Sequence, residues 1–306
     1  MGRHGLLSLL AVGFLLPAGP AQGQPPPNRP DYQNPALPTA KRVDDLLSRM
    51  TLEEKVAQMM CLWSAKRQIT DGKGNFNPGR VPEWFKVGIG RIERPSDGHG
   101  ARAQAEFTNA IQKWVKENTR LGIPVIFHDE ALHGLQGPEA TSFPQAIALA
   151  STWNPELVER AFAAVAVEVR ARGTQQVLAP VVDVARDPRW GRFEETYGED
   201  PYLVSRMGLA AVRGFQGGAR TIPAGRVIAT LKHMTGHGQP ESGTNVGPAS
   251  LGERTLRDIF FPPFELAVKQ GHARSLMPSY NEIDGIPSHA NRWICLLYTS
   301  PSPRDS

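Results

Sequence analysis

The sequence QVLAPVVDVARDPRWGRFEETYGEDP, residues 176–201, changes character part-way along. Its first nine residues are mostly apolar and rich in valine, which is typical of a strand buried on both faces. The rest is dense in arginines and carboxylates, and it ends in Asp200-Pro201, a pair that commonly opens a helix. The stretch therefore predicts a buried strand, then a polar loop, then a helix.

The same order repeats on both sides of this stretch. Mostly apolar segments predict further strands at 87–93, 124–131, 227–233 and 273–281. Helices are expected between and before the strands. One expected helix has an apolar face with Val43, Leu46, Leu47 and Met50, and another has an apolar face with Phe107, Ile111, Trp114 and Val115. A third begins at the cap Asn154-Pro155 and stops near Gly173. Capping boxes at 51–54 and 250–253 mark two further helix starts, and the last helix ends at Gly271.

This alternation defines the fold class. Buried strands separated by helices form a parallel sheet, so the class is α/β. A barrel and a doubly wound sheet both fit, but the latter usually binds a nucleotide through a glycine-rich turn. Neither G-x-G-x-x-G nor G-x-x-x-x-G-K-[ST] follows any of these segments. The sequence therefore predicts a TIM-type (β/α)8 barrel that is incomplete, with about five of the eight strands encoded.

The amino-terminal residues differ in composition from the rest. A basic start, an apolar run and small residues at 21–23 predict a cleaved signal peptide over residues 1–23, and hence a secreted or periplasmic protein. Residues 24–40 are rich in proline and predict a linker before a barrel domain at 41–294. Of the two cysteines, Cys61 is expected to be a small buried side chain, and no disulfide framework is expected.

Charge and hydropathy exclude two classes of partner. The formal net charge is +4, and basic and acidic residues are interleaved, so no nucleic acid is expected as a partner. No segment after the signal is long and apolar enough to span a membrane, so no membrane partner is expected either. The oligomeric state stays open.

Ionisable or hydrogen-bonding side chains follow four of the predicted strands. They are Asp129 and Glu130; Asp183, Arg186 and Asp187; Lys232 and His233; and Tyr280 and Asn281. In a parallel barrel these strand ends open onto one face, where active sites lie. One charged residue at a strand end is most often a solvated loop residue, but four successive ends predict one polar pocket.

Metal binding and serine chemistry fit the sequence less well. His128 and His133 do not form H-E-x-x-H, and His233 and His237 lie in a glycine-containing loop that fixes neither on a helix face. No G-x-S-x-G marks a nucleophilic serine. No metal ion or cofactor is therefore expected. Carboxylate, guanidinium, ammonium, imidazole and phenol groups beside aromatic rings suit a neutral sugar, whose hydroxyls both donate and accept.

Four motifs resemble a known family. They are HDEALHGL (128–135), DPRWGRFEETYGEDP (187–201), LKHMTGHGQPESGTNVGP (231–248) and SYNEIDGIPSHANRW (279–293). In this order they resemble the N-terminal barrel of glycoside hydrolase family 3, the β-glucosidase and β-xylosidase type. The resemblance covers about residues 40–293 and implies a retaining, exo-acting β-glycosidase that removes terminal β-linked sugars from oligosaccharides or aryl glycosides.

The resemblance also implies roles for individual residues. The residues that contact the sugar at the bond to be cut are Glu130, Arg192, Lys232, His233 and Tyr280. The choice of Arg192 over Arg186 or Arg189 comes from the resemblance alone. Asp187 and Asp200 are expected as turn and cap residues, Trp190 as a packing residue, and Glu194 and Glu195 as partners of nearby arginines.

The resemblance assigns no catalytic residue to this chain. It places the nucleophile, an aspartate in a Ser-Asp-Trp type motif, after residue 293, and the acid/base in a second domain. Residues 295–306 are expected to be a foreign, disordered tail. The chain by itself is therefore expected to be inactive and, with two open sheet edges, poorly stable.

Two alternative functions remain, and glucose is not distinguished from xylose. In the single-domain N-acetylglucosaminidase branch of the family, a K-H-F-P-G-H-G loop is followed by Asp-Ser-His, whereas residues 239–243 here are Gln-Pro-Glu-Ser-Gly. The other alternative is a non-catalytic sugar-binding module that keeps the pocket.

Overall fold

The computed structural model describes residues 29–298, so the predicted signal peptide lies outside the described residues. The chain divides after Thr51 into two compact units. In the first, η1 (Asp31–Gln33) packs with α1 (Thr39–Arg49). The Asp45 carboxylate accepts a hydrogen bond from the backbone N–H of Tyr32 at 2.9 Å. The predicted linker therefore includes helical residues at both 31–33 and 39–40.

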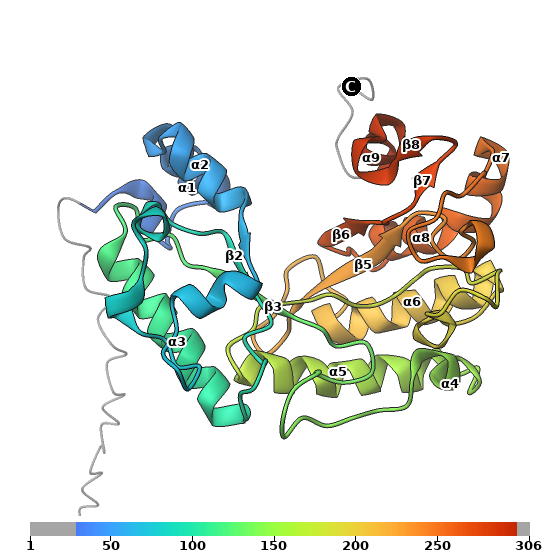
Figure 1. The fold of residues 1–306 in the computed structure, drawn as a ribbon, viewed down its shortest axis with the longest axis horizontal. Helices are drawn as coiled ribbons and strands as arrows, with labels where there is room; N and C mark the ends of the chain where they lie inside the picture. Colours follow the sequence, from blue (N-terminus) through green and yellow to red (C-terminus); the bar gives the residue numbers. More distant parts are fainter. Residues whose placement is uncertain (1–28, 299–306) are drawn as a thin grey trace, which may run out of the picture. The chain divides into compact units, whose positions relative to one another are not determined.

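The second unit is built on one sheet of six short parallel strands (Figure 1). They are β1 (Cys61–Leu62), β2 (Arg91–Glu93), β3 (Ile126–Asp129), β4 (Gln176–Val177), β5 (Ile228–Met234) and β6 (Ser275–Pro278). Each strand pairs in parallel with the next one in the chain. The strands follow one another around a half-barrel, which confirms the predicted incomplete barrel. Of these six strands, five were predicted and β1 was not, because two residues are too few to show an apolar run.

Helices connect successive strands of the sheet. They are α3 (Ala101–Asn118) between β2 and β3; α4 (Ala146–Ala150) and α5 (Pro155–Ala171) between β3 and β4; α6 (Pro201–Gln216) between β4 and β5; and α7 (Glu253–Thr255), the π-helix η7 (Leu256–Phe260) and α8 (Pro262–Lys269) between β5 and β6. In Figure 1 these helices lie outside the curled sheet. This arrangement leaves the carboxyl ends of the strands open.

Shorter elements complete the unit. They are α2 (Leu52–Met59) before β1; the 3-10 helices η2 (Ser64–Gln68), η3 (Pro78–Arg80), η4 (Glu83–Val87), η5 (Phe193–Glu195), η6 (Glu241–Gly243) and η8 (Ser288–Ala290); the antiparallel pair β7 (Glu282–Ile283) and β8 (Ile286–Pro287); and α9 (Arg292–Tyr298). Residues 295–298, expected as part of a tail, are thus helical, and residues 299–306 lie outside the described residues.

Two of the predicted helix caps are confirmed and one is wrong. Asn154 Oδ1 accepts from the backbone N–H of Leu157 at 2.9 Å, and Asp200 Oδ1 accepts from that of Leu203 at 2.7 Å. The predicted cap Ser250 instead donates from Oγ to Glu241 Oε1 at 2.8 Å, and Gly252 is the N-cap of α7. The helix therefore begins later than the capping box predicts, because the serine side chain is held by a carboxylate from a preceding loop.

The core of the second unit has two parts. One lies between α5, α6, α8 and the sheet, where the rings of Phe162 and Phe215 lie 4.7 Å apart and are both buried. The other lies between α3 and strands β1 to β3, around Phe85, Ile111 and Phe127. Truncating one such phenylalanine to alanine costs about 3–5 kcal/mol, so these clusters fix the sheet that carries the strand ends.

Cys61 is exposed, contrary to the prediction. It lies on β1, the edge strand of the sheet, so no further strand covers it. Among residues 29–298, no helix combines the length and the apolar character needed to cross a membrane.

Candidate functional site

The carboxyl ends of the strands border a cavity of about 440 Å³. Its lining includes all five residues that the sequence predicted as sugar contacts: Glu130, Arg192, Lys232, His233 and Tyr280. They come from segments up to 150 positions apart, and the half-barrel brings them together because parallel strands end on one side.

Lys232 and Glu130 form an ion pair in the lining of this cavity. Glu130 directly follows β3, and Lys232 lies on β5. Lys232 Nζ donates to Glu130 Oε2 at 2.8 Å, and the two side chains are 3% and 15% exposed. The other carboxylate oxygen, Oε1, lies 3.8 Å from the guanidinium of Arg94. The ammonium is therefore neutralised, while Glu130 keeps acceptor capacity towards the cavity.

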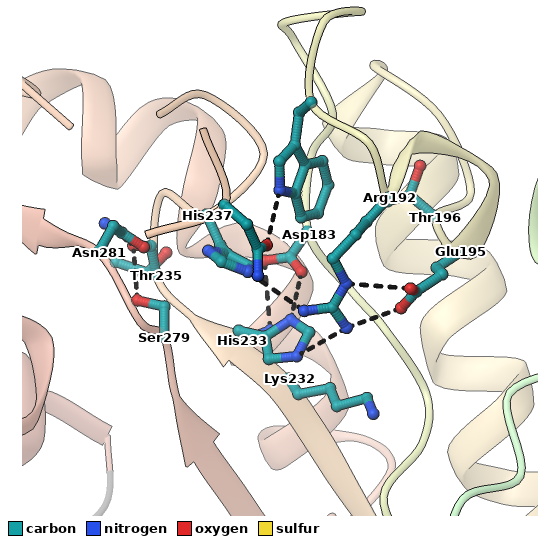
Figure 2. Close-up of polar contacts among 12 residues, drawn as sticks. Asp183, Arg192, Glu195, Thr196, Lys232, His233, Thr235, His237, Ser279 and Asn281 are labelled. Atoms are coloured by element: carbon teal, nitrogen blue, oxygen red, sulfur yellow. Dashed lines mark hydrogen bonds and ion pairs between the residues drawn. The ribbon is translucent and has the colours of Figure 1, made fainter. Parts of the chain in front are cut away.

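His233 is oriented by Asp183, which lies after β4 (Figure 2). Asp183 Oδ2 lies 2.7 Å from His233 Nδ1, and Asp183 Oδ1 accepts from the His233 backbone N–H at 3.2 Å. Burial by itself would raise the pKa of Asp183, but the imidazole of His233 holds that pKa below its ordinary value. Asp183 is therefore an anion that accepts a hydrogen bond from Nδ1–H of His233, and Nε2 of the same ring faces Arg192.

Arg192 connects this histidine to the loop after β4. Its guanidinium donates to both carboxylate oxygens of Glu195, at 3.0 and 2.8 Å, which confirms the predicted pairing. The same group lies 3.3 Å from His233 Nε2 and 3.4 Å from His237 Nε2, and Figure 2 shows it with the two rings on one side and Glu195 on the other. The pairing with Glu195 fixes the plane of the guanidinium beside the cavity.

The other arginines of this loop do not take part in the site. Arg186 is exposed, and Arg189 donates to Asp187 at 3.0 and 2.7 Å in an exposed turn. Asp187 also accepts from the Arg189 backbone N–H at 3.0 Å, as expected for a turn residue. Trp190 is buried and donates to Asn245 Oδ1, so it packs beneath the loop as predicted.

His237 also belongs to this cluster, although its sequence pattern was assessed above only for metal binding. Burial lowers its pKa to about 4, so it is neutral at pH 7. Its ring lies 5.0 Å from Trp190, 4.7 Å from His233 and 5.8 Å from Tyr280, centroid to centroid. The signal that could have found it is its position four residues after His233 in a loop that returns to the same strand end.

Gly238 holds the loop that carries His237 against the loop after β4. The Gly238 carbonyl accepts from the backbone N–H groups of Arg186 and Asp187 at 2.9 and 3.2 Å. A Cβ at this position would lie 2.3 Å from the carbonyl oxygen of Val184. Only glycine lets the two loops approach this closely, and this approach places the ring of His237 beside the guanidinium of Arg192.

Two predicted strand-end residues have structural roles instead. Asp129 is fully buried and accepts from Ser96, Gln104 and Thr174, and burial raises its pKa. Asn281 is also buried, and its side-chain amide donates to the Thr235 carbonyl at 3.2 Å (Figure 2). Their sequence neighbours Glu130 and Tyr280 face the cavity, because successive residues of an extended chain point to opposite sides.

Tyr280 is the most exposed member of the site, at 60%. Its ring is stacked over that of His233 with 6.4 Å between centroids. Deeper in the cavity, Gln176 accepts from Arg91 at 2.6 Å and donates to Thr230 and Ser275 at 2.8 and 3.0 Å. The cavity therefore has a hydrogen-bonded polar floor, charged walls and an aromatic ring at its mouth.

Comparison with known proteins identifies this arrangement. Residues 51–298 match the model of the glycosyl hydrolase family 3 N terminal domain. The chain belongs to this family. Its family 3 domain is 39% identical over 263 residues to a putative beta-xylosidase from Formosa agariphila, which covers 85% of this chain and 35% of that relative. The chain thus spans about a third of the length of this curated relative.

Solved structures agree with the family 3 assignment. A β-glucosidase from Erythrobacter marinus matches with a TM-score of 0.78 and 38% identity, over 85% of this chain and 34% of that one. The β-glucosidase from Listeria innocua in complex with glucose matches with a TM-score of 0.71 and 30% identity, over 83% of this chain and 34% of that one. The parallel half-barrel is therefore part of a TIM-type barrel fold.

Proposed function

We propose that this family 3 domain is the sugar-binding barrel of a retaining, exo-acting β-glycosidase of the β-glucosidase or β-xylosidase type. The observation that carries the proposal is the convergence of Glu130, Arg192, Lys232, His233 and Tyr280 on one cavity. Relatives and solved neighbours named as β-xylosidase and β-glucosidase support the reaction class. The substrate is a terminal β-linked glucose or xylose of an oligosaccharide or aryl glycoside.

The chemistry of the five side chains suits a pyranose ring. Glu130 accepts from sugar hydroxyls, while Lys232 and Arg192 donate to hydroxyl oxygens. His233 lies between Asp183 and Arg192, which set its proton on Nδ1. The exposed ring of Tyr280 covers an apolar face of the sugar at the mouth of the cavity. Each group is already in contact with a protein partner, so the site is preorganised before sugar enters.

Hydrolysis with retention needs a nucleophile and an acid/base about 5–5.5 Å apart. The family resemblance gives neither role to a residue of this chain. The cavity-lining carboxylate of Glu130 is ion-paired with Lys232 at 2.8 Å and suits binding rather than attack. We therefore propose that the chain by itself binds sugar without cleaving it.

Calorimetric titration of the chain with glucose and with xylose tests the binding role. Glu130→Gln removes the carboxylate charge and is expected to weaken binding by at least about tenfold, since a charged hydrogen bond contributes about 1.5–3 kcal/mol. Glu194→Gln is the matched control, because Glu194 is outside the cavity lining. Equal affinity in the two variants, or no sugar binding by the wild-type chain, would overturn the assignment.

Hydrolysis assays with aryl β-glucosides and β-xylosides test the proposal that the chain by itself does not cleave sugar. No hydrolysis is expected from the purified chain. Saturable hydrolysis that survives Glu130→Ala would contradict both the binding role of Glu130 and the absence of catalytic groups. Sugar binding together with a cooperative thermal transition of ordinary enthalpy would favour the alternative of a self-sufficient, non-catalytic binding module.

Export is part of the same proposal. The basic start, apolar run and small residues of positions 1–23 suit a signal that is removed during secretion to the periplasm or the medium. Expression of the full chain in a bacterium and sequencing of the mature amino terminus test this. The expected first residue is close to Gln24, and an intact Met1 in the periplasmic or secreted protein would argue against cleavage.

A further inference from the structure

Three potential metal ligands lie together on the β1–β3 side of the cavity. Cys61 is on β1, Glu93 is on β2 and His128 is on β3. One ligand atom of each lies within 4.8 Å of the other two. We propose that these residues bind a divalent cation of the zinc class, a site separate from the sugar-contacting residues and independent of whether sugar binds.

The register of the sheet explains why the three side chains meet. Cys61 pairs with Arg91, and Glu93 pairs with His128. Arg91 and Glu93 are two positions apart on β2, so their side chains share a face. Cys61, Glu93 and His128 therefore all face the inside of the curled sheet, and all three line the cavity. A site held by three adjacent strands is more precise than one carried on loops.

Hydrogen bonding within the cluster is incomplete. Glu93 Oε2 lies 3.8 Å from His128 Nε2 and Glu93 Oε1 lies 3.6 Å from Arg94 Nε, both longer than a hydrogen bond. His128 is 95% buried, since only 5% of it is exposed, and its Nδ1 has no hydrogen-bond partner within residues 29–298. Nε2 is the His128 nitrogen that approaches Glu93, so a metal ion between these groups would bind Nε2.

The donor set indicates the class of cation. Thiolate, imidazole and carboxylate are ligands of Zn²⁺, whereas Ca²⁺ and Mg²⁺ prefer oxygen ligands alone. Distances of about 2.0–2.3 Å from zinc to such ligands place the ligand atoms about 3–4 Å apart, so closure from the present spacing needs only side-chain rotation. Three protein ligands leave a fourth position for water, as in catalytic rather than structural zinc sites.

Binding has a defined proton balance. Coordination by the Cys61 thiol replaces its S–H bond with an S–metal bond and releases one proton to solvent. Affinity should fall as the pH is lowered.

Cobalt titration of the untagged chain tests the proposal directly. A thiolate bound to Co²⁺ gives an intense near-ultraviolet charge-transfer band, which oxygen and nitrogen ligands do not give. The band is expected at one equivalent in the wild-type chain and in Cys295→Ser, and it is expected to be absent in Cys61→Ser. The two cysteines are both exposed, so each substitution is tolerated by the fold and each controls for the other. A band that persists in Cys61→Ser, or none in the wild type, would overturn the site.

Zinc calorimetry then tests the other two ligands. Glu93→Gln and His128→Asn are each expected to weaken Zn²⁺ binding by at least about 100-fold, more than the loss of an outer-shell partner costs. Glu194→Gln is the control for the carboxylate change, and circular dichroism checks that His128→Asn is folded. An unchanged Zn²⁺ affinity in Glu93→Gln would show that Glu93 is not a ligand. An unchanged Zn²⁺ affinity in both variants would leave Cys61 as the sole ligand and refute the proposed site.

Discussion

The two sides of the cavity differ in the lengths of the contacts between their charged groups. On the β4–β5 side, contacts from Asp183 to His233 and from Arg192 to Glu195 are 2.7 to 3.0 Å long. On the β1–β3 side, the contacts of Glu93 with Arg94 and His128 are 3.6 and 3.8 Å long. Each side also keeps a buried imidazole nitrogen without a hydrogen-bond partner within residues 29–298: Nδ1 of His237 on the first side and Nδ1 of His128 on the second. The sides therefore differ in the lengths of their ion-pair contacts.

This difference separates two kinds of polar site. A network of short contacts holds its members in fixed positions and suits a ligand that is recognised by the directions of its hydrogen bonds, such as a sugar. A cluster of thiol, carboxylate and imidazole without short contacts among them suits a ligand that supplies the bonds itself, such as a metal ion. Glu130 lies between the two sides, with Lys232 at 2.8 Å and Arg94 at 3.8 Å.

The largest expected effect comes from removing each cation beside Glu130 in turn. Lys232→Met leaves a largely buried carboxylate without its partner and should lower the free energy of unfolding by about 3–5 kcal/mol. Arg94 is 36% exposed, so Arg94→Met should cost less than about 1 kcal/mol. Urea unfolding of the two variants measures the difference. Equal losses of unfolding free energy in the two variants would mean that Lys232 and Arg94 stabilise Glu130 to the same extent.

The next effect is a loss of stability in acid that depends on His237. Its pKa is lowered from 6.5 to about 4 in the folded chain, so between these values the unfolded chain binds more protons. The stabilisation that follows from keeping His237 neutral in the folded chain is present above pH 6.5. It is lost as the pH falls towards 4, which lowers the free energy of unfolding by about 3 kcal/mol in total. His237→Gln should remove this part of the pH dependence of the unfolding free energy.

The control for this measurement is the exposed His289. The curve of unfolding free energy against pH for His289→Gln should run parallel to that of the wild type. Curves for His237→Gln and the wild type that are parallel between pH 4 and 6.5 would show that His237 is not held neutral by its burial.

A smaller effect tests the geometry of the same network. Lysine cannot reproduce the paired hydrogen bonds of Arg192 to Glu195, so Arg192→Lys should lower the unfolding free energy by about 1–2 kcal/mol and weaken sugar binding. Arg189→Lys changes an exposed residue of the same loop and should have no measurable effect. Similar results for both arginines would show that the charge alone matters and not the fork of the guanidinium.

Much of the fold followed from local patterns in the sequence. The apolar runs at 124–131, 176–184 and 227–233 overlap β3, β4 and β5, because a strand buried on both faces needs an unbroken apolar run. The caps Asn154 and Asp200 were also readable, since a cap depends on neighbours within three residues. Strand β1 was not readable, because its two residues are paired only by tertiary contacts.

The sequence by itself determined the α/β class, the order of the strands and, through four long motifs, the family. The strand pattern left open which of two adjacent polar residues faces the cavity. The resemblance chose Glu130 over Asp129 and Tyr280 over Asn281, and the tertiary structure supplies the physical reason by burying Asp129 and Asn281. It alone brought Cys61, Glu93 and His128 within 4.8 Å, although no spacing in the sequence suggests a metal site. The physical reason is that periodicity is a local property, whereas side-chain direction and proximity across strands depend on register, and a shift of one residue reverses them.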